Sequence, residues 1–93
     1  MESDDIEKLF LHVLEDSGQD TDAVRQVFSS LVRTTLEYRD RVLSSKGIVV
    51  TVEDVRWSLD RLVRALETDS MPEVENEIGL DLLNIWLREL QSV

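Results

Sequence analysis

The sequence predicts an all-α fold, a single domain over residues 1–93 in which about four helices form an antiparallel bundle. Apolar residues recur at three- and four-residue spacing along most of the chain, which is the period of a helix. Capping residues and glycines stand at the edges of these stretches, where helices begin and end. The chain has no cysteine and is 42% apolar, so a packed core rather than disulfide bonds must hold it together.

The first two helices are expected at residues 4–16 and 22–46. Ser3 or Asp4 can cap the first, and Gly18 follows its last turn. Asp20 or Thr21 can cap the second, whose apolar stripe continues almost to Gly47. The second helix is therefore predicted to be the longest element of the chain.

The third and fourth helices are expected at residues 52–67 and 72–91. Thr51 followed by Asp54 resembles a capping box with Asp in place of Glu. Pro72 suits the first turn of a helix. Gly79 lowers helical propensity by about 1 kcal/mol relative to Ala, so the fourth helix can divide there into two pieces.

The charge of the chain excludes several classes of partner. Asp and Glu number 20 against 10 Lys and Arg, which gives a net charge of −10. Such a chain repels phosphate backbones and anionic lipid, so neither direct nucleic-acid binding nor a membrane partner is expected. No apolar run reaches the roughly 20 residues that span a bilayer, and residues 1–5 show no secretory signal. A cytoplasmic, intracellular protein is therefore expected.

The inventory of reactive side chains predicts that the protein is not an enzyme. The only histidine, His12, falls on the polar side of its helix. Residues 16–27 lack the glycine at position six and the glutamate at position twelve of a calcium loop. No glycine-rich phosphate loop occurs. No catalytic residue, metal ligand or cofactor is therefore assigned.

The fourth helix is apolar over more than half its circumference. Seven of the eleven residues from 80 to 90 are Leu, Ile or Trp, whereas a surface helix needs an apolar stripe of only about 100°. One interpretation is central burial within the chain. The other is that Leu82, Ile85 and Trp86 meet a second chain, because large apolar patches are rarely left exposed.

Trp57 is the second candidate for partner contact. On a helical wheel it lies opposite the apolar face of its helix and near Arg61 and Arg64. Tryptophan and arginine are enriched among the residues that dominate protein interfaces, so these three are assigned to partner binding. The alternative is a tryptophan covered by another part of the same chain.

Residues 4–67 resemble histone-fold proteins in their order of elements. A first helix, a long second helix and a short extended segment precede Val50-Thr51-Val52-Glu53-Asp54-Val55-Arg56-Trp57-Ser58-Leu59, which looks like the loop and third helix of that family. The resemblance implies a handshake dimer that serves as a subunit of a larger assembly. The basic residues with which histones hold DNA are missing.

These observations predict a small acidic protein-interaction module, an adaptor or inhibitor that is either a homodimer or bound to a larger protein. One alternative is the histone-fold-like subunit. The other rests on a similarity of character to small acidic helical proteins of phages and mobile elements. It implies an inhibitor that mimics nucleic acid and occupies a basic groove of a nucleic-acid-binding protein.

Overall fold

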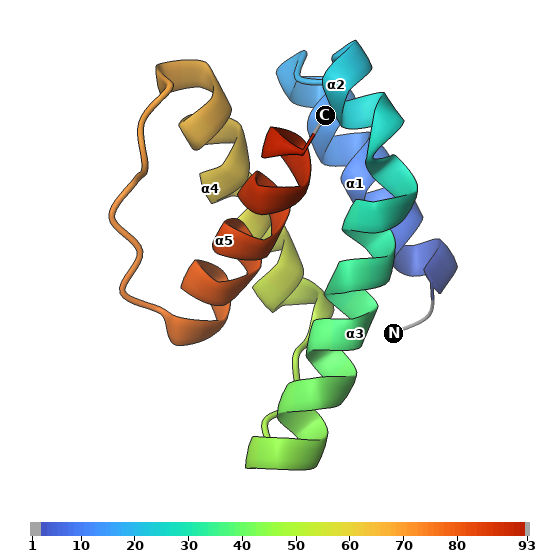
Figure 1. The fold of residues 1–93 in the computed structure, drawn as a ribbon, viewed down its shortest axis with the longest axis vertical. Helices are drawn as coiled ribbons and strands as arrows, with labels where there is room; N and C mark the ends of the chain where they lie inside the picture. The colour runs from blue at the N-terminus through green and yellow to red at the C-terminus, as the bar shows by residue number, and fades with distance from the viewer. Residues whose placement is uncertain (1–2, 93) are drawn as a thin grey trace.

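Five α-helices make up the computed structural model, which describes residues 3–92 (Figure 1). In chain order they are α1 (Ser3–Ser17), α2 (Asp22–Gln26), α3 (Phe28–Lys46), α4 (Val52–Thr68) and α5 (Glu77–Gln91). The described residues include no strand, and the helices pack around one core. The predicted all-α class is confirmed.

The predicted helix over residues 22–46 is interrupted at Val27, so the expectation of one continuous helix was wrong there. Thr21 caps α2, and Val27 leaves the helical conformation with φ −106° and ψ 10°. Val24 of α2 is buried, and the Phe28 ring at the start of α3 meets Phe10 of α1 edge-on at 6.2 Å. At 19 residues, α3 is still the longest helix that the structure describes.

The predicted fourth helix begins five residues later than expected, at Glu77. The Asn76 side chain accepts hydrogen bonds from the backbone N–H groups of Ile78 and Gly79, which fixes the start of α5. Residues 69–76, called the strap here, connect α4 to α5 without a helix. Gly79 lies in the first turn of α5 and does not divide it.

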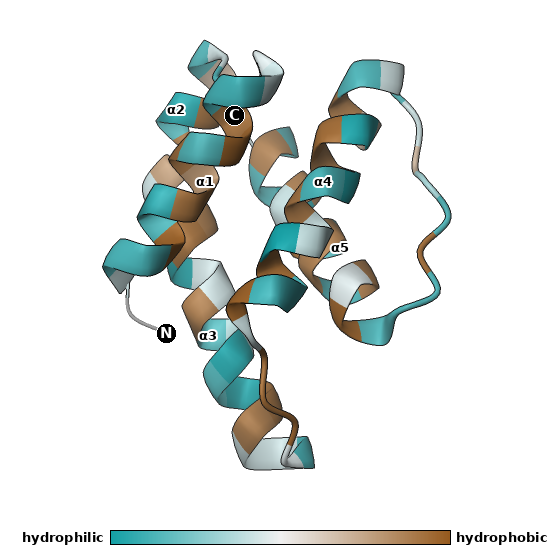
Figure 2. Ribbon diagram, turned by 180° about the vertical axis from the view of Figure 1, so that it is seen from behind, coloured by the Kyte–Doolittle hydropathy of each residue, from teal (hydrophilic) through white to brown (hydrophobic). Residues whose placement is uncertain are grey.

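The sequence predicted an antiparallel bundle, but the helices are not all antiparallel. The strap carries the chain back along α4, so that α4 and α5 run in the same direction (Figure 1). Accordingly, Trp57 near the start of α4 lies against Gly79 near the start of α5. Helix α3 runs opposite to α5, since Thr35 bonds to Trp86 and Lys46 to Glu77. The hydrophobic sides of the helices face inward (Figure 2).

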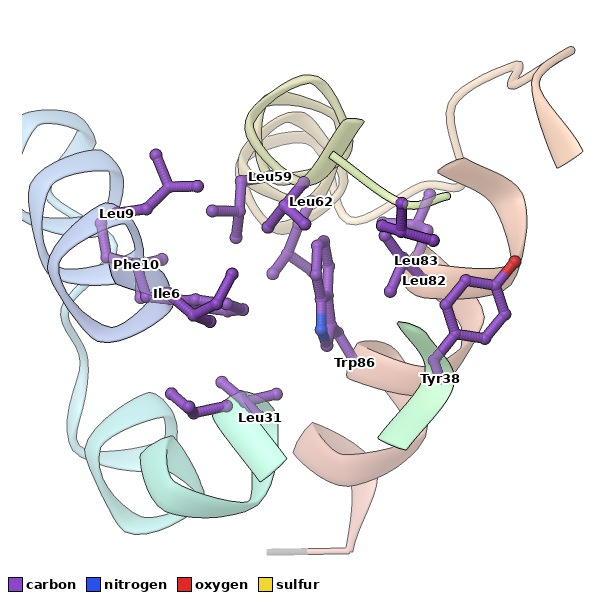
Figure 3. Close-up of a cluster of buried hydrophobic side chains, with 14 of the residues drawn as sticks. Ile6, Leu9, Phe10, Leu31, Tyr38, Leu59, Leu62, Leu82, Leu83 and Trp86 are labelled. Atoms are coloured by element: carbon purple, nitrogen blue, oxygen red, sulfur yellow. The ribbon is translucent and has the colours of Figure 1, made fainter. Parts of the chain in front are cut away.

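Trp86 stands at the centre of the core (Figure 3). It is 0% exposed, and its ring meets Phe10 of α1 edge-on at 5.3 Å. Its indole Nε1–H donates to the Thr35 hydroxyl of α3 at 2.9 Å, and that hydroxyl in turn donates to the Leu31 carbonyl at 2.7 Å. The one polar atom of the largest core side chain is therefore satisfied.

Replacing Thr35 by Val should lower the free energy of unfolding by about 1–3 kcal/mol, because the nearly isosteric side chain leaves the Trp86 N–H buried without an acceptor. Thr34→Val is the matched control: Thr34 bonds only to carbonyls of its own helix. Urea denaturation of both variants measures the difference. Equal losses in the two would show that the Thr35–Trp86 bond contributes nothing.

Candidate protein-interaction surfaces

The structure separates the three candidate residues of α5. Leu82 and Trp86 are both 0% exposed and belong to the core, so neither is accessible to a partner. Their burial corrects the assignment of these two residues to a partner surface. The physical reason is that α5 is covered on one side by α3 and on the other by α4, which is the central burial that its broad apolar arc also allowed.

Ile85 is half-buried in a groove between α3 and α5, called the α3–α5 groove here. Tyr38, Arg41 and Arg88 line the groove with it, and its volume is about 510 Å³. The Tyr38 hydroxyl donates to Asp81 at 2.8 Å, and the Arg41 guanidinium lies 5.4 Å from the Tyr38 ring centre. Burial and the bond to Asp81 raise the pKa of Tyr38 above its ordinary value of 10.0, so Tyr38 acts as a hydrogen-bond donor.

The sequence did not single out Tyr38 and Arg41. Their spacing of three residues places them on neighbouring positions of one helix, and an aromatic side chain beside an arginine was a usable signal. What the sequence could not supply was α5, whose Ile85 and Arg88 form the opposite wall of the groove.

Trp57, Arg61 and Arg64 do lie together and form what is called the α4 ridge here. The Arg61 guanidinium stands 4.3 Å from the centre of the Trp57 ring, within the range of a cation–π interaction. Trp57 is half-buried, because its six-membered ring lies against Gly79 of α5. Arg64 is exposed one turn after Arg61. Part of the Trp57 side chain is therefore covered by the same chain, and part of it remains exposed.

Two grooves flank the α4 ridge. Arg61 and Arg64 line the groove between α1 and α4, together with Val13 and acidic residues of both helices. Trp57 lines the groove between α4 and the start of α5, together with Asn76. The residues of the ridge thus form walls of two depressions of about 430 and 300 Å³.

Residues 3–92 contain no group of three His, Cys, Asp or Glu side chains placed to hold a metal ion. Within the same residues no helix combines the length and apolar character that crossing a membrane requires. His12 is exposed on α1. No protein-family model, no curated protein and no solved structure matches the chain.

Replacing Gly79 by Ala should destabilise the fold by about 1–3 kcal/mol, as overpacking does. A Cβ atom there would lie 2.4 Å from Cζ3 of Trp57. In a Trp57→Ala background most of this penalty should vanish, because the nearest remaining atom, Cγ1 of Val74, would lie 3.3 Å from the added Cβ atom. Denaturation of the four proteins completes the cycle. An equal loss of stability in both backgrounds would contradict the close Gly79–Trp57 contact.

Proposed function

We propose that this chain is a non-enzymatic protein-interaction module, an adaptor or inhibitor, that contacts its partner through the α4 ridge. The observation that carries the proposal is the Arg61 guanidinium stacked at 4.3 Å on the half-buried Trp57 ring. These are the residue types that most often dominate binding energy. The Trp57 ring packs against Gly79, so the Trp57 side chain has little conformational freedom to lose on binding.

The remaining apolar surface favours a different protein as partner over an obligate homodimer. Obligate dimers bury large hydrophobic interfaces. Here the core of α3 and α4 is covered by α5 of the same chain. The exposed large apolar side chains of the described residues are spread over three helices, the connection between α3 and α4, and the strap: Leu11, Leu43, Val49, Met71 and Leu80. The handshake dimer implied by the histone-fold resemblance is disfavoured for the same reason.

A second candidate function is the acidic inhibitor that occupies a basic groove. Helices α1, α4 and α5 end at the same end of the molecule (Figure 1), and the last turns of α1 and α4 contain no basic residue. Glu15, Asp16, Glu67 and Asp69 lie at these helix ends. Binding of this kind should weaken steeply between about 50 and 500 mM salt, because the Debye length shortens roughly threefold over that range. An affinity that does not depend on salt would count against it.

The ridge is tested by the double variant Arg61→Ala/Arg64→Ala. The wild-type chain is used to capture its partner from cells that encode the chain. The affinity of the purified pair is then measured by calorimetry. We expect the double variant to bind about tenfold more weakly or worse, a loss of about 1.4 kcal/mol. Both arginines are accessible at the surface, so the fold should be unaffected.

Arg56→Ala is the matched control, because Arg56 is exposed on α4 and lies beside Trp57 in sequence but lines neither groove. Its affinity should equal that of the wild type. If the double variant binds as tightly as the Arg56 variant, the partner does not use the α4 ridge.

A further inference from the structure

A groove opens between the C-terminal halves of α4 and α5, on a different side of α4 from the ridge. It has a volume of about 340 Å³ and is called the α4–α5 groove here. Five apolar residues line it: Ala65, Leu66, Met71, Leu87 and Leu90. The three leucines are half-buried and pack against the core, whereas Met71, on the strap, is 47% exposed. The groove is therefore an extension of the core that reaches the surface.

We propose that the α4–α5 groove binds the apolar face of a basic amphipathic helix from a partner protein. A groove between two helices can take a third one through apolar side chains spaced three and four residues apart. Met71 supports this use, since the flexible thioether side chain adapts to different apolar surfaces and is common at helix-binding sites.

The charges around the groove determine the chemistry of the occupant. Of the residues that the structure describes, Asp69 is the only charged one in the groove lining. Arg64 of α4 lines the α1–α4 groove instead, and Arg88 of α5 lines the α3–α5 groove. The strap, residues 69–76, contains three acids, Asp69, Glu73 and Glu75, and no base. A basic helix meets complementary charge here, and an acidic one meets repulsion.

The backbone adds to this negative potential. Because α4 and α5 are parallel, both C-terminal ends lie beside the groove, where the helix dipoles present partial negative charge. The last turn of α4 carries no basic side chain to offset it, whereas the last turn of α5 carries Arg88, which lines the α3–α5 groove. Cationic side chains that flank the apolar face of a bound helix would supply that charge.

A small-molecule ligand fits the groove less well than a helix. Small-molecule sites hold a few polar groups that converge on the ligand. The polar lining residues here, Asp69, Ser70 and Gln91, are all exposed, and Ser70 already shares a hydrogen bond with Thr68. Among the described residues, no buried side-chain nitrogen or oxygen lacks a partner.

This inference goes beyond the proposed function, since it adds a second surface and states the chemistry of its ligand. The ridge variants leave the groove lining unchanged, and the groove variants leave Trp57, Arg61 and Arg64 unchanged. Failure at one surface is thus distinguishable from failure at the other.

The test uses the full chain labelled with ¹⁵N and a peptide of about 18 residues, roughly five helical turns, with leucines on one face and lysines on the other. We expect saturable binding, with amide shifts concentrated at Leu66, Met71, Leu87 and Leu90. Met71→Gln should weaken binding about fivefold, as partial loss of a buried apolar side chain does. Leu11→Gln is the matched control, because Leu11 is 46% exposed, like Met71, but lies on α1; its affinity should not change.

Two peptide controls separate the parts of the proposal. A scrambled peptide of the same composition lacks an apolar face and should bind at least tenfold more weakly. A peptide with glutamate in place of every lysine should not bind. The proposal would be overturned if either control peptide bound as tightly as the Leu/Lys peptide, or if the Leu/Lys peptide did not bind. It would also be overturned if Met71→Gln and Leu11→Gln weakened binding equally, or if the amide shifts were confined to another face.

Discussion

The fold depends on the buried hydrogen bond between Trp86 and Thr35. The indole is fully buried, and within residues 3–92 its N–H donates to the Thr35 hydroxyl at 2.9 Å. Such a bond is satisfied at one relative position of α3 and α5, so it fixes how the two helices slide along each other. The same alignment pairs Tyr38 with Asp81 and Lys46 with Glu77 farther along. The salt bridge raises the pKa of Lys46 and lowers that of Glu77, but both groups are exposed, so the buried bond is the stronger constraint.

The position of α5 in turn determines what the surface presents. Once Trp86 is seated, the first turn of α5 lies against α4, and Gly79 meets the Trp57 ring. Only a residue without a Cβ atom allows that approach. The ring is then supported on one side while the Arg61 guanidinium covers the other. A core hydrogen bond and a glycine thus set the geometry of the α4 ridge, although neither belongs to it.

Local signals in the sequence predicted the fold class and several helix ends, because they act within a few residues. The Thr51–Asp54 capping box is formed, and Gly47 ends α3 with φ 68°. The parallel course of α5 was missed because it depends on the strap, where Pro72 was interpreted as a helix start. A helical wheel likewise identifies the broad apolar arc around Trp86, but it cannot tell whether the same chain or a partner covers that arc. Tertiary packing decides this, as it also decides that Trp57 rests on Gly79.

The parallel arrangement of α1, α4 and α5 places three negative dipole ends together, and the last turns of α1 and α4 carry no basic residue. This departs from the usual preference for cations at helix C-termini. The starts of α2 and α3 lie at the same end and offset part of the potential. Sequences that depart from a local rule tend to do so at functional sites. At the end of α4 the departure lies beside an apolar groove rather than on a uniformly polar surface. The last turns of α1 and α4 contain no base that would neutralise the partial negative charge of the helix ends. A cationic partner can neutralise this charge and so stabilise the helices.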